Sequence, residues 1–205
     1  EERFILKFIE NGGKLINTKC KGHIKISESA AVCNSQLDKY FAIGNFSFMQ
    51  RTICERYITI GSRVSIGAFS HPTNWLSTLE FQFRDSTPFY SETLDTTSHK
   101  DISQYINEVR IGPDTWIGDN SFVKTGISLG AGCIVAAGSV VVKDVEPYAI
   151  VGGNPAKTIK YRFKEKIIDK LLEIKWWELD IRELKGVEFD KIDLAIEKIK
   201  EIKGN

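Results

Sequence analysis

The region from Ile111 to Glu146 repeats every six residues, and this period constrains the fold more than any other feature of the sequence. An aliphatic residue opens six successive units, at Ile111, Ile117, Val123, Leu129, Val135 and Val141. Small or β-branched residues follow four positions later in each unit, at Thr115, Ser121, Ile127, Cys133, Ser139 and Val145. A period of six fits neither an amphipathic helix nor a strand that alternates between two faces. It is typical of a parallel β-solenoid.

In such a solenoid each unit supplies one short strand and one corner, so the opening aliphatic residue always returns to the interior. Glycine follows it in three units, at Gly112, Gly118 and Gly130, which favours corners with positive φ or close contact with a neighbouring turn. The alternative is a run of short sandwich strands. That alternative predicts polar and apolar alternation with irregular turns, and the sequence has neither. We therefore predict a mainly β protein built as a parallel solenoid.

The repeat continues upstream less regularly and is then interrupted. Apolar residues lie six apart with occasional five-residue steps, at Ile26, Val32, Leu37, Ile43 and Met49. We predict a cap and irregular first coils over residues 1–40, and a solenoid domain over 41–158. Residues 72–108 lack the repeat and are rich in aromatic residues. A long aromatic segment inside a compact repeat predicts a functional insertion, which we expect to fold over the coil and shape a pocket.

The C-terminal part changes from the repeat to helical spacing. Proline and glycine residues in the segment 147–157 predict that the solenoid ends there and that the backbone turns. Apolar residues at three- and four-residue intervals then predict helices over residues 163–176 and 192–202. We expect this extension, residues 159–205, to cover the open end of the coil.

Composition limits the partners of the protein. The 205 residues include 28 basic and 27 acidic side chains, so the net charge of +1 predicts neither a nucleic-acid nor an anionic-membrane partner. Without an 18-residue apolar run or a secretory signal, we predict a cytoplasmic protein with no membrane span. The four cysteines, Cys20, Cys33, Cys54 and Cys133, lack metal-site spacing, which predicts structural thiols and no metal.

Among the three histidines, His71 has the most suggestive position. It ends a repeat unit and begins the aromatic insertion, so an imidazole lies between a rigid frame and the insertion. With an ordinary pKa near 6.5, histidine suits a general base at neutral pH. The alternative is a structural histidine bonded to a loop carbonyl. We interpret His23 and His99 as ordinary surface or packing residues.

Other motifs narrow the chemistry. The sequence lacks a Gly-x-Ser-x-Gly motif, a Walker loop and a dinucleotide fingerprint, which favours direct transfer over a covalent enzyme intermediate. Lys143, Lys157 and Lys160 lie where the last turn leaves the solenoid, and their ammonium groups could pair with phosphates. Taken singly, each is more commonly explained as a solvated surface lysine.

Several segments together resemble a known family. They are the hexapeptide units, Trp-Ile-Gly at 116–118, Ala-Ala-Gly-Ser-Val-Val-Val-Lys-Asp-Val at 136–145, and Pro-Tyr-Ala-Ile-Val-Gly-Gly-Asn-Pro-Ala-Lys at 147–157. They are similar to the left-handed β-helix acetyltransferases. The insertion and Leu-Leu-Glu-Ile-Lys-Trp-Trp at 171–177 resemble the xenobiotic acetyltransferase branch, which includes streptogramin and chloramphenicol acetyltransferases. The resemblance covers roughly residues 41–180 and implies a left-handed coil and a homotrimer, with acetyl-CoA bound between neighbouring coils.

The resemblance also implies roles for individual residues. His71 matches the catalytic histidine. The residues implied to line the cleft for acetyl-CoA are Asp119, Ala137, Val142, Lys143, Lys157 and Lys160. Asp119 replaces the usual small or hydroxyl residue, so its contact is the least secure. Small residues around Ala137 suit close passage of a pantetheine arm.

The implied reaction is acetyl transfer from acetyl-CoA to a hydroxyl, with His71 as general base. The segment after His71 resembles inserts of enzymes of polysaccharide biosynthesis, so a saccharide is the first acceptor hypothesis, and Trp75, Phe89 and Tyr90 are the acceptor candidates. The alternatives are antibiotic O-acetylation and sugar N-acetylation. A non-catalytic scaffold and a metal-dependent β-helix carbonic anhydrase are weaker alternatives.

Overall fold

The computed structural model describes residues 7–79, 82–83 and 101–204. The acceptor candidates Phe89 and Tyr90, and also His99, lie outside the described residues.

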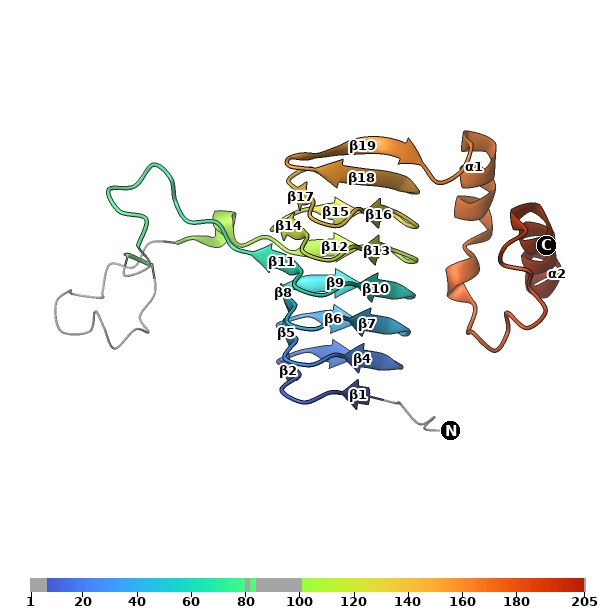
Figure 1. The fold of residues 1–205 in the computed structure, drawn as a ribbon, viewed down its shortest axis with the longest axis horizontal. Coiled ribbons are helices and arrows are strands. Elements are labelled where there is room, and N and C mark those ends of the chain that lie inside the picture. The colour runs from blue at the N-terminus through green and yellow to red at the C-terminus, as the bar shows by residue number, and fades with distance from the viewer. Residues whose placement is uncertain (1–6, 80–81, 84–100, 205) are drawn as a thin grey trace.

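Short parallel strands form three sheets, which are the faces of a prism (Figure 1). The first sheet contains β1 (Lys7–Ile9), β4 (Ile24–Ile26), β7 (Phe41–Ile43), β10 (Ile58–Ile60), β13 (Trp116–Ile117), β16 (Ile134–Val135), β18 (Ala149–Gly153) and β19 (Ala156–Tyr161). The second contains β2 (Lys14–Ile16), β5 (Ala31–Cys33), β8 (Phe48–Gln50), β11 (Ser65–Ala68), β14 (Phe122–Lys124) and β17 (Val140–Val141). The third contains β3 (Lys19–Cys20), β6 (Gln36–Leu37), β9 (Thr52–Cys54), β12 (Val109–Ile111) and β15 (Ser128–Leu129). This arrangement is the predicted left-handed parallel β-helix with a long insertion and a helical extension.

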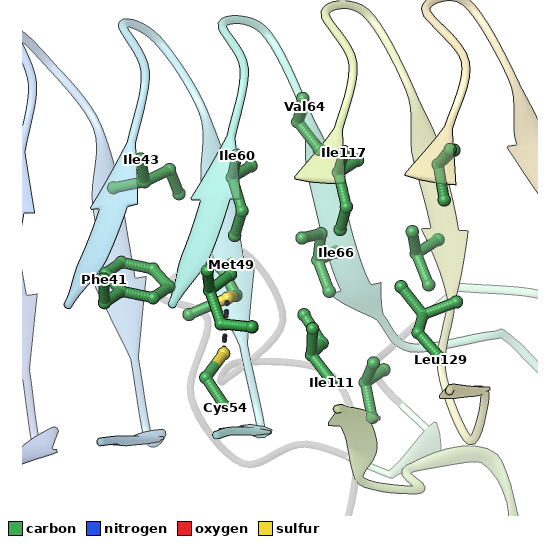
Figure 2. Close-up of a cluster of buried hydrophobic side chains, with 14 of the residues drawn as sticks. Phe41, Ile43, Met49, Cys54, Ile60, Val64, Ile66, Ile111, Ile117 and Leu129 are labelled. Carbon is green, nitrogen blue, oxygen red and sulfur yellow. Dashed lines mark hydrogen bonds between the residues drawn. The ribbon is translucent and has the colours of Figure 1, made fainter. Parts of the chain in front are cut away.

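Both columns of the hexapeptide repeat point into the prism, as predicted. The six opening residues are at most 2% exposed, and the residues four positions later are at most 7% exposed. Figure 2 shows Ile60, Ile66, Ile117 and Leu129 among the side chains that stack between successive turns. The hydroxyls in the second column bond locally, since Thr115 Oγ1 donates to the Gly112 carbonyl at 2.7 Å. The core is therefore a continuous apolar column with its polar atoms satisfied.

The first turns are more regular than the sequence suggested. Ile24 pairs with Phe41 and Phe41 pairs with Ile58, so these turns contain 17 residues, whereas Trp116 and Ile134 are 18 apart. The missing residue falls before the third sheet, which explains the five-residue steps that end at Leu37 and Cys54. Residues 7–40 thus form two complete turns.

Glycine follows the aliphatic residue because successive turns come close together. A Cβ atom on Gly118 would lie 2.6 Å from the Ala137 nitrogen, and one on Gly130 would lie 2.5 Å from the Pro147 nitrogen. Of the two reasons considered for these glycines, close approach is therefore the one that applies.

The coil continues past Glu146 and ends within residues 147–157, the segment whose proline and glycine residues predicted its end. β18 still pairs in parallel with β16, and the chain reverses only between Gly153 and Ala156, to return as the antiparallel β19. Pro147 does not interrupt the coil because it precedes β18, where the sheet requires no hydrogen bond from its nitrogen.

The two predicted helices are present, but the prediction of where they pack was wrong. α1 (Glu165–Ile174) is followed by the short helix η4 (Trp176–Glu178), and α2 (Ile192–Lys203) ends the described chain. They lie along the corner between the third and first sheets and not over the end of the coil (Figure 1). We call this region the helical corner; it comprises residues 162–203 and the corner residues that they contact. The Tyr40 and Tyr57 rings stack there at 4.7 Å, and Trp176 extends the stack at 5.0 Å from Tyr57.

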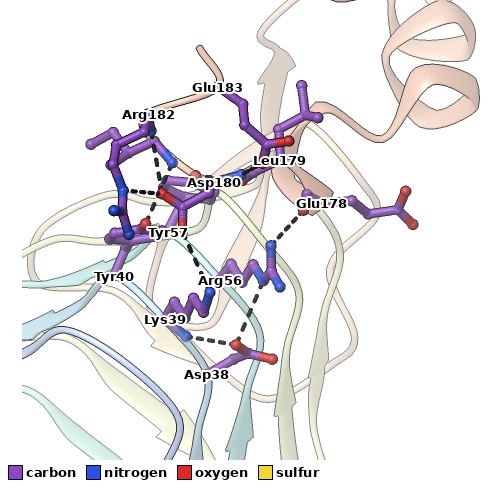
Figure 3. A network of polar contacts seen from close by, with 11 residues as sticks. Asp38, Lys39, Tyr40, Arg56, Tyr57, Glu178, Leu179, Asp180, Arg182 and Glu183 are labelled. Carbon is purple, nitrogen blue, oxygen red and sulfur yellow. Dashed lines mark hydrogen bonds and ion pairs between the residues drawn. The ribbon is translucent and has the colours of Figure 1, made fainter. Parts of the chain in front are cut away.

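Polar contacts reinforce the helical corner, as Figure 3 shows. Asp180 pairs with Lys39 at 3.4 Å and with Arg182 at 3.2 Å, and the Tyr57 hydroxyl donates to the Leu179 carbonyl at 2.8 Å. Burial would raise the pKa of Asp180, but hydrogen bonds from Tyr40, Arg182 and Lys39 outweigh it and hold the pKa well below its usual range. The extension is thus joined to the prism by apolar packing and by ionic contacts.

Candidate active site

His71 leaves the prism through a bulge in β11. Gly67 has φ of +73°, and the register with β14 shifts between Ile66 and Ala68. A Cβ atom on Gly67 would lie 2.1 Å from the Gln50 carbonyl oxygen, so glycine is required there. Bulges are frequent next to active sites because they change the direction of a strand. Here the bulge at Gly67 directs the chain out of the coil four residues before His71.

The His71 ring is held on one side and exposed on the other. Its Nδ1 atom lies 2.5 Å from the Thr78 carbonyl oxygen. The ring stacks on Phe69 at 5.2 Å with an interplanar angle of 20°, and the Phe83 ring contacts it edgewise at 5.8 Å. The loop-carbonyl bond of the structural alternative is therefore present, yet the residue is exposed as a base requires. A carbonyl only accepts hydrogen bonds, so Nδ1 carries a proton, and in the neutral ring Nε2 has the lone pair.

The described part of the insertion supplies an aromatic cluster beside His71. Trp75 contacts Phe83 at 6.3 Å and Tyr105 at 6.5 Å, and the Ser70 amide donates to the Tyr105 carbonyl at 3.4 Å. Tyr105 ends the short helix η3 (Ser103–Tyr105). This part projects away from the prism and does not fold over the coil, contrary to expectation (Figure 1). We call His71, its aromatic neighbours and the bulge the insert corner.

Asp119 and Ala137 lie in successive turns at the corner between the first and second sheets. Both are exposed. The Asp119 carboxylate already accepts a hydrogen bond from the Ser62 amide at 2.9 Å, which ties two turns together. Asp119 therefore has a structural role, whether or not it contacts a ligand.

Val142, Lys143 and Lys157 line one pocket of about 330 Å³ near the end of the coil. The β18–β19 hairpin brings Lys157 next to the segment that follows β17. Lys160 is not among the residues that line this pocket; it pairs with Ile150 in the hairpin. The structure thus brings together two of the three predicted lysines.

The pocket and His71 lie along the same corner of the prism. β11, β14 and β17 are neighbours in the second sheet, so the segments that leave β11 and β17 are separated by two strand spacings, about 10 Å. Asp119 and Ala137 lie at the other edge of this sheet. Apart from Lys160, which lies on β19 of the first sheet, the predicted catalytic and cofactor residues therefore lie near the two edges of the second sheet.

The cysteines show no sign of a nucleophile. All four are free thiols, and burial raises the pKa of Cys133 to about 11, with that of Cys54 also raised. A thiol with a raised pKa is a poor nucleophile at neutral pH.

Over the described ranges, no group of three or more His, Cys, Asp or Glu side chains could hold a metal ion. No helix in this same part of the chain is both long and apolar enough to span a bilayer.

Sequence reasoning missed three features of the site. Phe83 was one aromatic residue among many, and only the structure shows that it contacts His71. The Thr78 carbonyl could not be found, because a backbone acceptor leaves no signature in the sequence. Gly67 had a weak signal, since it is the glycine of the last repeat unit before the interruption.

Comparison with known proteins agrees with the repeat and the fold. Residues 108–143 match the family described as bacterial transferase hexapeptide (six repeats). A chloramphenicol acetyltransferase from Klebsiella aerogenes is 39% identical over 141 residues, which are 67% of this chain and 64% of the relative. The virginiamycin A acetyltransferase of Staphylococcus aureus is 51% identical over 49 residues, 24% of this chain and 22% of the relative. The chain thus spans just under two thirds of the length of the chloramphenicol acetyltransferases that it matches.

A solved structure shows the same fold. A mutant of AntD, an N-acyltransferase from Bacillus cereus in complex with dTDP and coenzyme A, matches with a TM-score of 0.61 and 18% identity over 85% of this chain and 91% of that chain. The repeat and the prism define a hexapeptide-repeat protein of the left-handed β-helix type. The predicted resemblance to the hexapeptide-repeat acetyltransferases is confirmed, and the relatives reported above carry the names of chloramphenicol and virginiamycin A acetyltransferases.

Proposed function

We propose that this protein transfers an acetyl group from acetyl-CoA to a hydroxyl of a small molecule, with His71 as the general base. One observation carries the proposal. An exposed imidazole stands on a rigid frame with Nδ1 bonded to the Thr78 carbonyl, which leaves Nε2 to take a proton. The similarity to named acetyltransferases supports the reaction class.

The reaction needs one proton acceptor and one proton donor, and His71 can be both. As the acceptor oxygen attacks the thioester carbonyl, its proton moves to Nε2 and a C–O bond forms. The C–S bond then breaks, and the imidazolium returns the proton to the departing thiolate. Backbone N–H groups stabilise the oxyanion in between.

Acetyl-CoA, the acetyl donor, would lie along the face of the prism that the predicted cleft residues border. Small side chains at Ala137 leave the backbone open to a pantetheine arm, while Lys143 and Lys157 would pair with phosphates in the pocket. Lys160 would pair with a phosphate from the surface of the β18–β19 hairpin, outside this pocket. In the proposed homotrimer a second copy closes this face, because one copy alone presents Asp119 and Ala137 on an open surface.

The kind of acceptor is proposed from two observations, the names of the relatives and the aromatic residues of the insert corner. The relatives carry the names of antibiotic acetyltransferases, and the aromatic rings around His71 suit an acceptor with apolar surface. We therefore place an antibiotic hydroxyl first. The saccharide acceptor, stacked on Trp75, stays a prediction, as do sugar N-acetylation and the cytoplasmic location.

Release of CoA from acetyl-CoA tests the proposal, with chloramphenicol, a streptogramin and a panel of nucleotide-linked and oligomeric sugars as acceptors. His71→Ala is expected to lower kcat by about 10² to 10⁴-fold, because the general base is lost, with acetyl-CoA affinity little changed. His23→Ala is the control, since His23 stacks on Tyr40 at the helical corner. Full turnover by His71→Ala would remove this residue from the mechanism, and no CoA binding at all would favour a scaffold.

A further inference from the structure

We infer that Phe83 is a positioning residue, which fixes the orientation and tautomer of the His71 ring; the inference rests on His71 being the base proposed above. The backbone alone does not fix the orientation of the His71 ring, because His71 lies beyond the bulge, outside the coil, and its side chain is exposed. Its orientation must come from contacts made by the ring itself. Three such contacts are present, with Phe69, with Phe83 and with the Thr78 carbonyl.

Phe83 is the buried member of this group. It is 8% exposed, although it belongs to an insertion that projects from the prism. Its ring contacts Phe69 at 6.4 Å, His71 at 5.8 Å and Trp75 at 6.3 Å. Each contact is of the edge type, with interplanar angles of 89°, 72° and 66°. Such pairs are directional, because the positive edge of one ring meets the negative face of another.

These contacts explain how the insertion acts on His71. Phe69 follows β11 and belongs to the frame, whereas Thr78 belongs to the insertion. Phe83 touches both Phe69 and His71, and through Trp75 it is linked to Tyr105 at the other end of the insertion. The ring of Phe83 therefore holds the imidazole between the Phe69 face and the Thr78 carbonyl. If it is removed, His71 can rotate about χ1 and χ2 and lose the bond at Nδ1.

Phe83→Leu tests the inference in the full chain. A loosened base is expected to lower kcat about tenfold to a hundredfold, less than loss of the base itself, with KM for acetyl-CoA unchanged. ¹⁵N NMR of the histidine ring should show the change directly, because the Nδ1–H form of neutral His71 would lose population to the Nε2–H form. Phe83→Tyr, which keeps the ring, should restore kcat and tautomer.

Leu76→Ser is the matched control, since Leu76 lies in the same insertion and is fully exposed. Phe83→Met, which keeps volume without a ring, replaces the leucine variant if that does not fold. Equal kcat and equal tautomer in Phe83→Leu and in the control would overturn the inference. Turnover of His71→Ala tests the proposed function separately. The NMR measurement of the His71 tautomer still tests the role of Phe83 if that function is disproved.

Discussion

Two corners of the same prism are built in opposite ways. At the helical corner, Tyr40 and Tyr57 stack on one another, a second buried cluster surrounds Ile196, and Asp180 holds the chain with ionic contacts. At the insert corner the chain leaves through a bulge, and His71 is held by ring contacts and one carbonyl. The solenoid thus serves as a common frame for both corners. One corner adds stability to it, and the other uses it to present a side chain.

Positive φ at residues other than glycine occurs at all three corners of the prism, for example at Ser29, Arg51 and Tyr57. Tyr40, Tyr57 and Tyr148 all have positive φ, between 57° and 64°. This conformation costs a residue other than glycine about 1 to 2 kcal/mol. Packing of α1 and α2 against the rings offsets that cost, so the helical corner and its helices stabilise one another.

Ile196→Ala gives the largest effect expected on stability. Ile196 is fully buried in the second core, so its truncation should lower the free energy of unfolding by about 2 to 5 kcal/mol. Turnover per folded molecule should not change if the helical corner is only structural. Urea unfolding and the CoA-release assay measure the two quantities.

Leu194→Ala is the control on the same helix, because Leu194 is 53% exposed and its loss should cost less than about 0.5 kcal/mol. A drop in turnover with Ile196→Ala, under conditions where it stays folded, would show that the two corners are coupled.

Gly67→Ala tests what makes the insert corner different. Alanine would have to adopt the positive φ, at about 1 to 2 kcal/mol, and its Cβ would also clash with the Gln50 carbonyl. At the helical corner, Gly186 has a φ of +85°, and a Cβ atom there would meet open space. Gly186→Ala would therefore cost only the free energy of placing alanine at positive φ. Gly67→Ala should therefore lower the free energy of unfolding more than Gly186→Ala, and it should also lower kcat. Equal losses from urea unfolding would mean that the contact with Gln50 does not hold the bulge.

The sequence predicted the frame better than what is attached to it. The columns through Ile117 and Thr115 are periodic, and a period determines which residues face inward. The apolar face of α2 predicted a helix but not the surface it packs against. That surface is formed by α1 and by corner residues such as Tyr148, which have no regular spacing relative to α2 in the sequence. For the site, His71 stood out as a titratable residue at a break in the repeat. The Thr78 carbonyl and the Phe83 contact did not, because both depend on how the insertion folds.

Asp180→Asn is expected to have the smallest effect on the free energy of unfolding, and this effect should depend on pH because the helical corner is held partly by ionic contacts. The folded-state pKa of Asp180 is lowered, so its contribution to stability is complete above the unfolded pKa of about 3.9 and is lost progressively as the pH falls from there through the lower folded-state pKa. Asp180→Asn should cost about 1 kcal/mol at pH 7, because the contacts are partly exposed, and nothing in strong acid. Urea unfolding from pH 7 down into strong acid should show the wild-type and variant curves beginning to converge below about pH 4, whereas Asp190→Asn, at an exposed position, should follow the wild type throughout. Curves for Asp180→Asn that stay parallel to the wild type would mean that packing of the rings and helices, without the ionic contacts, holds the helical corner.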